Sequence, residues 1–246
     1  MQTLHQFKEF PEVKIKSALI SVYNKNGFEP LIKALHQQQV TLFATGGTFD
    51  FIQSLKIPIT AVEDVTDYPS IFGGRVKTLH PKIFGGILNR RNDANDVMEV
   101  EKYNIPCIDL VVVDLYPFEA TVASGADESA IIEKIDIGGV SLIRAAAKNF
   151  NDVSIIASAD DVTAFLQTYN QGNGEVNLSF RKKLAQKAFA ITSHYDSAIF
   201  NYFYSKNEQS EPVLNLQCNN SVTLRYGENP HQRGFYFGNL KETFEQ

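Results

Sequence analysis

Short apolar runs alternate with helical patterns in this chain, and this alternation limits the folds that the sequence can adopt. Residues 14–22 and 40–44 have the length and apolar content of buried strands. The segment after each run repeats apolar residues along one helix face, namely Phe28, Leu31, Ile32 and Leu35, then Phe51, Ile52 and Leu55. The order strand, loop, helix predicts an α/β fold, a doubly wound and mainly parallel sheet with helices on both faces.

Three later runs extend the predicted sheet. Residues 57–62 contain Pro58, which restricts them to an edge or to the start of a strand. Residues 108–113 are apolar on both faces and are expected in the interior, and residues 153–157 provide a fifth strand. Further helices are predicted at 93–102, at 140–149 and along an aromatic stripe from Phe180 to Tyr202.

Composition excludes several classes of function. With 246 residues, a formal net charge of −5 and a pI near 5.6, the chain lacks the broad basic face that nucleic acid requires. No apolar run reaches the roughly 20 residues of a membrane helix, and the first residues lack the apolar middle of a signal peptide, so a cytoplasmic protein is expected. Cys107 and Cys218 lie far apart and predict neither a disulfide nor a metal site.

Four marked segments follow predicted strands, at residues 23–27, 45–48, 73–86 and 114–118. In an open parallel sheet the carboxyl ends of the strands meet at one edge, and ligands bind there. We therefore expect these segments to share one edge. Each alone has an ordinary explanation, since a glycine pair can be a tight turn and Lys25 a surface lysine. Their coincidence in an otherwise acidic chain favours a site for a small anion.

The segment 73–86 contains two glycine pairs and several cationic side chains. If it is extended, Arg75 and Lys77 point to one side and Val76 to the core, so both cations converge on one spot. This pattern predicts a phosphate cradle, although a solvated basic turn explains the same residues. Thr45 to Thr48, between a strand and a helix, could hold an oxyanion at the helix start.

Three residues could carry acid–base chemistry or could be structural. Asp136 could cap the following helix, Lys148 could be a cation favoured by a helix dipole, and Tyr116 could be a core aromatic. Twelve residues of unbroken helix would separate Asp136 from Lys148 by about 18 Å. The two can share one site only if the chain turns at Gly138-Gly139 or if a sizeable substrate bridges them.

Six ordered motifs give the chain a resemblance to a known family. They begin at Ser21 (SVYNKNG), Thr45 (TGGT), Gly73 (GGRVKTLHP), Leu115 (LYPF), Ile135 (IDIGG) and Arg144 (RAAAKN). Together they resemble the bifunctional purine biosynthesis proteins that join AICAR formyltransferase to IMP cyclohydrolase. The resemblance implies a cyclohydrolase domain at 1–204 with a fold similar to methylglyoxal synthase. It also implies a linker and the start of a formyltransferase domain at 205–246.

The resemblance also implies roles for individual residues. The implied catalytic set is Lys148, Asp136, Lys77 and Tyr116. Implied substrate-binding residues are Tyr23, Asn24, Lys25, Thr45, Gly46, Gly47, Thr48, Arg75, Thr78, Asp114, Ile137 and Gly138. Arg225 and Tyr226 would contact AICAR on the formyltransferase side. Lys77 thereby moves from phosphate binding towards ring chemistry, and Asp114 stands where the family often has Asn.

The implied reaction is dehydrative closure of formyl-AICAR to IMP, the last step of purine biosynthesis. A base must take a proton from the poorly nucleophilic carboxamide, and donors must protonate the departing oxygen. The resemblance implies no metal or cofactor for this reaction, 10-formyltetrahydrofolate for the missing formyltransferase part, and a homodimer. Formyltransferase activity is expected to be absent from this chain. Two alternatives remain, a regulatory module that binds a phosphorylated effector and a methylglyoxal synthase-like lyase.

Overall fold

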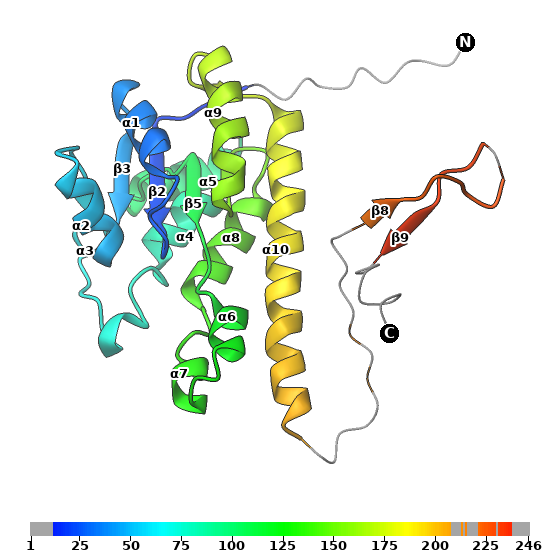
Figure 1. Cartoon of the computed structure of the whole chain (residues 1–246). Helices are drawn as coiled ribbons and strands as arrows, with labels where there is room; N and C mark the ends of the chain where they lie inside the picture. The colour runs from blue at the N-terminus through cyan, green and yellow to red at the C-terminus, as the bar shows by residue number, and fades with distance from the viewer. Residues whose placement is uncertain (1–11, 208–212, 214, 216–220, 230, 238–246) are drawn as a thin grey trace, which may run out of the picture. The chain divides into compact units, whose positions relative to one another are not determined.

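The computed structural model describes residues 12–207, 213, 215, 221–229 and 231–237 (Figure 1). The chain forms two compact units, Met1–Thr192 and Ser193–Gln246, and each is described by itself. The division falls inside the long helix α10, Leu178–Ser205, whose presence confirms the helix predicted from the aromatic stripe. The domain boundary after residue 204 stays a prediction.

A five-stranded parallel sheet forms the centre of the first unit (Figure 1). Its strand order is β4-β3-β2-β5-β6. The bounds are Thr60–Ala61 for β4, Thr41–Ala44 for β3, Ser17–Ser21 for β2, Leu110–Val113 for β5 and Ser154–Ile156 for β6. All five predicted strands are present and parallel, and the Pro58 segment supplies the edge strand β4, as expected.

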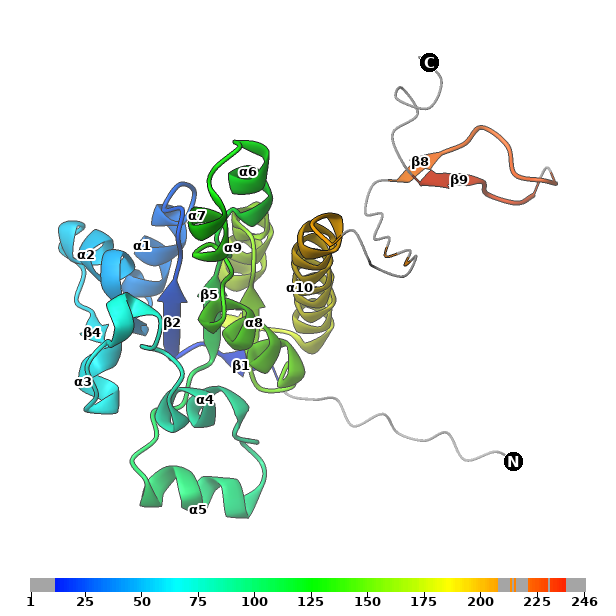
Figure 2. The same ribbon diagram turned by 90° about the horizontal axis from the view of Figure 1, so that it is seen from below.

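Helices cover both faces of this sheet (Figure 2). Helix α1, Glu29–Gln37, and helix α9, Val162–Gln171, contact each other on one face. Helix α8, Gly138–Lys148, packs on β5 and β6 on the other face, beside α4, Pro81–Leu88. The chain therefore winds outwards from β2 and β5 in opposite directions, which confirms the doubly wound α/β fold.

The remaining elements of the first unit are short. They are β1 Val13–Lys14, α2 Gly46–Ser54, α3 Val62–Thr66, η1 Phe72–Gly74, α5 Ala94–Lys102, α6 Phe118–Ala123, α7 Glu128–Ile132, η2 Ala159–Asp161 and β7 Glu175–Val176. Strands β1 and β7 pair antiparallel outside the main sheet. Helix α5 confirms the polar helix predicted at 93–102, and Asp93 caps it through its side chain.

The core explains why the strands lack the usual alternation of apolar and polar residues. Every residue of β5 and β6 is buried, as are the middle residues of β2. The helices meet the sheet through one face each, and Leu31, Ile32 and Leu35 of α1 are fully buried. Burial on both faces is the condition under which a parallel strand consists of consecutive aliphatic residues.

Two predicted loops are partly helical. Helix α4, residues 81–88, begins inside the segment 73–86, because Pro81 presets the helical backbone and His80 Nδ1 accepts a hydrogen bond from Lys82 N at 3.2 Å. In the second loop, Thr45 is the N-cap of α2, and the residues after it form the first helical turn. The loop at this position is therefore shorter than the sequence pattern suggested.

The second unit contains the end of α10 and a small hairpin. Strand β8, Ser221–Thr223, pairs antiparallel with β9, Phe235–Phe237. Residues 208–210 of the predicted polar linker lie outside the described residues. No helix among the described residues has both the length and the hydropathy needed to cross a membrane.

Candidate active site

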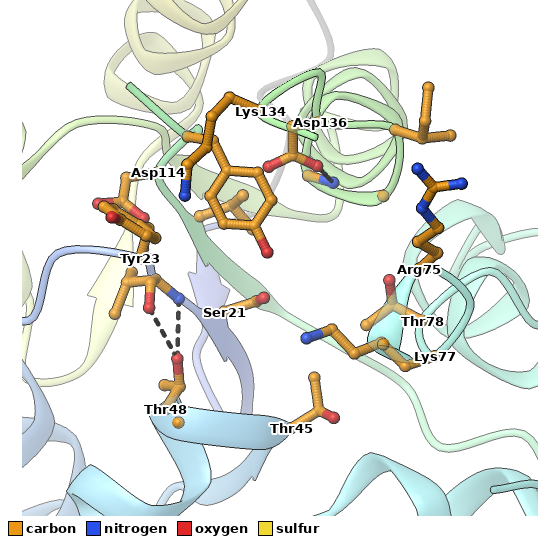
Figure 3. A pocket seen from close by; sticks show the side chains of 18 of the residues that line it. Ser21, Tyr23, Thr45, Thr48, Arg75, Lys77, Thr78, Asp114, Lys134 and Asp136 are labelled. Carbon is orange, nitrogen blue, oxygen red and sulfur yellow. Dashed lines mark hydrogen bonds between the residues drawn. The ribbon is translucent and has the colours of Figure 1, made fainter. Parts of the chain in front are cut away.

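A pocket of about 660 Å³ lies at the carboxyl edge of the sheet (Figure 3). Its wall comes from the ends of β2, β3 and β5, from residues 73–78 and from residues 132–139. All four segments expected to share this edge contribute side chains, which confirms the predicted convergence. The volume falls within the range of sites that hold a metabolite-sized ligand.

Two lysine amines face the first turn of α2. A Cβ atom placed on Gly46 would lie 3.5 Å from Lys77 Nζ, and one on Gly47 would lie 3.7 Å from Lys25 Nζ. Gly46 has a φ of +53°, in the left-handed region that favours glycine. The first-turn amides of a helix have no partner within it, and its dipole favours anions there. Amides and amines together form a cationic end of the pocket, which we call the α2 cradle.

The threonine hydroxyls beside the α2 cradle are already engaged. Thr45 Oγ1 donates to Glu63 Oε1 at 2.7 Å. Thr48 Oγ1 accepts from Val22 N at 3.0 Å and donates to Val22 O at 2.9 Å, so it ties α2 to the end of β2. Both hydroxyls therefore shape the cradle, and the donors left for an anion are the backbone amides and the lysines.

Arg75 and Lys77 do not converge on one spot, so that expectation was wrong. The predicted alternation requires an extended backbone, but Gly73 and Gly74 have positive φ values and Arg75 is in the helical region. Lys77 points to the α2 cradle (Figure 3). The Arg75 guanidinium instead forms an ion pair with Glu133. Both cations line the pocket at separate places.

Asp136 lies where α8 begins. Its Oδ1 accepts a hydrogen bond from Gly139 N at 2.6 Å, so the carboxylate caps the helix and also lines the pocket. Burial raises the pKa of Asp136, and backbone hydrogen bonds from Gly139 and Tyr116 and the charge of Lys77 partly oppose that shift. A carboxylate with a raised pKa is a stronger base than one in water.

Tyr116 lines the pocket from the segment after β5. Burial raises its pKa above the ordinary value of 10.0, and the charges of Asp136, Tyr23 and Asp114 add to this effect. The phenol is therefore protonated at neutral pH and can donate a hydrogen bond. Its ring meets the Tyr23 ring edge to face, with the ring centroids 5.2 Å apart.

Asp114 joins the ends of β5 and β2. One carboxylate oxygen accepts from Tyr23 N, and the other accepts from Asn24 N at 2.9 Å. Burial raises the pKa of Asp114, while these two hydrogen bonds and the charge of Lys25 lower it. The side chain that stands where the family often has Asn thus holds the backbone of the neighbouring loop through both oxygens.

Lys148 lies away from the other three residues of the implied catalytic set. It is the last residue of α8, is exposed, and is not among the residues that line the pocket. Gly138 and Gly139 begin α8 instead of breaking it, so the turn that would bring Lys148 back to Asp136 is not present. In a parallel sheet the helix runs antiparallel to the strands, which places Lys148 near their amino ends.

Of the other implied residues, some line the pocket and some do not. Thr78 Oγ1 lies 3.1 Å from the position of a Cβ on Gly138, and both residues line the pocket with Ile137. Asn24 and Gly46 flank the pocket without lining it. Arg225 and Tyr226 belong to the second unit, where the guanidinium lies 5.3 Å from the Tyr226 ring centroid. These positions do not test the implied roles, which stay predictions.

Glu133 and Lys134 are pocket residues that sequence reasoning missed. They follow α7 and precede the Ile-Asp-Ile-Gly-Gly motif, and as charged residues after a polar helix they resemble a solvated turn. Their proximity to the motif was the available signal. Across the parts of the chain that the structure describes, no group of three or more His, Cys, Asp and Glu side chains could hold a metal ion.

Comparison with known proteins gives two family matches. Residues 27–141 match the MGS-like domain, and residues 146–246 match the AICARFT/IMPCHase bienzyme family. The crystal structure of ForH shares 34% sequence identity and a TM-score of 0.69, over 78% of this chain and 98% of that one.

Curated relatives match almost the whole chain. The bifunctional purine biosynthesis protein PurH of Bacteroides thetaiotaomicron is 58% identical over 95% of this chain and 45% of its own length. PurH of Rippkaea orientalis is 45% identical over 89% of this chain and 44% of its own length. The chain thus spans less than half the length of these relatives. On this identity and coverage, together with the match to ForH, the chain belongs to the AICARFT/IMPCHase bienzyme family.

Proposed function

We propose that this chain is an IMP cyclohydrolase, which closes formyl-AICAR to IMP with loss of water. One observation carries the proposal: Asp136 and Tyr116 border a pocket whose other end is the cationic α2 cradle, and the Lys77 amine of that cradle also acts electrostatically on Asp136. A ribonucleotide has a dianionic phosphate at one end and a reactive base at the other. The pocket likewise has a cationic end that suits the phosphate and an end with acid–base groups that suits the reactive base.

The α2 cradle suits the phosphate. Amides at a helix start and two nearby amines are a recurrent arrangement for phosphate oxygens. Lys25 Nζ is held by the carbonyls of Val22 at 2.8 Å and Tyr23 at 2.9 Å, so its position is set before a ligand arrives. Preorganised donors lower the entropy that binding costs.

The base end suits ring closure. We assign Asp136 as the base that takes a proton from the carboxamide nitrogen while this nitrogen bonds to the formyl carbon. Tyr116 or Lys77 protonates the former carbonyl oxygen, giving a carbinolamine. That oxygen then leaves as water with the proton that Asp136 took up, and the formamide nitrogen returns a proton to Tyr116 or Lys77 as the C–N double bond forms. The raised pKa of Asp136 and the protonated phenol of Tyr116 support these roles.

The catalytic role that we propose for Lys148 rests on the family resemblance alone. Because it is exposed at the far end of α8, we propose that it acts in the pocket of a second copy of the chain. This arrangement would make the pocket of one chain incomplete and would require the homodimer that the resemblance implies.

The remaining proposals concern the protein as a whole. We propose a cytoplasmic homodimer whose cyclohydrolase domain extends to residue 204. We also propose that residues 205–246 begin a formyltransferase part that uses 10-formyltetrahydrofolate and contacts AICAR through Arg225 and Tyr226. The names and lengths of the PurH relatives support this wider assignment.

A direct assay tests the proposed activity. The purified chain should convert formyl-AICAR to IMP, followed by the change in absorbance, and should transfer no formyl group from 10-formyltetrahydrofolate to AICAR. Binding of formyl-AICAR without turnover would contradict the cyclohydrolase assignment and favour a regulatory module. Turnover of dihydroxyacetone phosphate instead would indicate a methylglyoxal synthase-like lyase.

A further inference from the structure

Lys134 is the cation that the fold places beside Tyr116. Its Nζ lies 5.4 Å from the Tyr116 ring centroid and 5.1 Å from the Tyr23 ring centroid. These distances are within the range of a cation–π interaction with both rings. In Figure 3 the Lys134 side chain reaches down from the segment before Asp136 towards Tyr23.

The backbone holds Lys134 in this position. It lies in the short connection between α7 and α8, where Lys134 N donates to Ile131 O at 3.0 Å and Ile135 N donates to Ile132 O at 3.0 Å. The side chain is half-buried and lines the pocket. Because the Lys134 side chain is already restricted by its surroundings, it loses less conformational freedom on contact with the tyrosine rings than a fully exposed lysine would.

The surroundings explain why a cation is useful here. Asp114 and Asp136 both act electrostatically on Tyr116. An amine among these carboxylates offsets their negative potential. Its contact with two mutually perpendicular rings also restricts how either ring can tilt.

We propose that Lys134 is a positioning residue for ring closure, which holds the Tyr116 ring against Tyr23 so that the phenol stays directed into the pocket. This inference rests on the proposed cyclohydrolase function. Lys134 does not act on the substrate itself. Its loss should therefore lower kcat and leave KM nearly unchanged, because the α2 cradle that binds phosphate is untouched.

Substitution tests this role in the full chain. Lys134→Met should lower kcat about tenfold, and Lys134→Arg, which keeps the cation, should recover most of the rate. Lys102→Met is the matched control, since Lys102 Nζ lies 5.0 Å from the Tyr103 ring centroid outside the pocket. Equal Tm values would establish that the variants fold, and Lys134→Gln gives a second neutral replacement.

A spectroscopic measurement separates this inference from the proposed function. The ε-methylene protons of Lys134 should resonate upfield of those of exposed lysines because they lie over two rings, and Lys134→Met should shift the Tyr116 ring signals. Three outcomes would each overturn the positioning role. They are a kcat of Lys134→Met within about twofold of that of the unmodified chain, an Arg variant as slow as the Met variant, and an unshifted ε-methylene signal. If the unmodified chain shows the upfield signal but does not turn over formyl-AICAR, the proposed function is overturned, whereas the contact of Lys134 with the two tyrosine rings is upheld.

Discussion

Arg75 and Glu133 form an ion pair between two walls of the pocket, although 58 residues separate them in the sequence. Arg75 comes from the segment after η1 and Glu133 from the end of α7. Both side chains are more than half exposed. A phosphorylated ligand that uses Arg75 must therefore compete with a carboxylate already bound to it.

Removal of this carboxylate should strengthen nucleotide binding. Glu133→Gln is expected to lower the Kd of IMP by up to about fivefold, since an exposed ion pair contributes roughly 0–1 kcal/mol. Calorimetry at low and high salt measures the effect, which should shrink as salt screens the charges. Glu128→Gln removes the same charge from α7 outside the pocket and should leave the Kd unchanged. Weaker IMP binding by Glu133→Gln would mean that Glu133 contacts the nucleotide.

Asp136→Asn should lower kcat by about 10²- to 10⁴-fold, since the amide cannot accept the carboxamide proton. Stopped-flow and steady-state absorbance measure the loss. Asp127→Asn is the matched control, because Asp127 caps α7 by accepting from Ala130 N at 2.8 Å and does not line the pocket. A variant of Asp136 with near-normal kcat would remove it as the base.

The pH dependence should report the environment of Asp136. Burial raises its pKa above the ordinary 3.8, so the acid limb of kcat/KM should lie above pH 3.8 and disappear in Asp136→Asn. The folded state also holds this proton more tightly than the unfolded state. This difference stabilises the folded state by its full amount below pH 3.8, and the stabilisation is lost as the pH rises through the raised pKa. Urea unfolding over this range should show a smaller loss for Asp136→Asn.

Gly139→Ala should displace Asp136 without unfolding the domain. A Cβ on Gly139 would lie 2.6 Å from Asp136 Oδ2, which is too close for a non-bonded contact. We expect kcat to fall at least tenfold with little change in Tm, as misplacement of a catalytic group is costly. Ser141→Ala, at a partly buried position of the same helix that does not line the pocket, provides the control. An unchanged kcat would show that the carboxylate position is not critical.

Asp114→Asn should loosen the loop after β2. An amide offers one acceptor oxygen where the carboxylate uses two, so Tyr23 N or Asn24 N would lose its partner. The expected result is a rise in the KM for formyl-AICAR of several-fold, corresponding to about 1 kcal/mol for a lost hydrogen bond. Faster amide exchange at residues 23 and 24 would accompany it, and unchanged exchange would contradict this explanation.

Complementation tests the placement of Lys148. Lys148→Ala is expected to abolish cyclisation while the chain stays folded. If the residue acts in a second copy, mixing refolded Lys148→Ala with Asp136→Asn should restore about a quarter of the native activity, because half of the dimers are mixed and each has one complete pocket. More than a few per cent of native activity in Lys148→Ala alone would remove Lys148 from the catalytic set.

Local pattern was sufficient for the sheet and for the location of the site. The apolar runs predicted all five parallel strands, because a strand buried on both faces must be apolar throughout. The convergence of four loops followed from parallel topology alone. Local pattern failed where backbone conformation departed from the expected regular form, as at Gly73 and Gly74, whose positive φ values turned Arg75 away from Lys77.

The sequence by itself therefore determined the α/β fold, the edge of the sheet at which the pocket lies, and the presence of Asp136 and Tyr116 near it. Only the tertiary structure decided which charges meet. It brought Glu133 and Lys134 into the pocket through the α7–α8 connection and placed Lys148 at the far end of α8. Hydrophobic periodicity is encoded over a few neighbouring residues, whereas contacts between distant side chains depend on how whole elements pack.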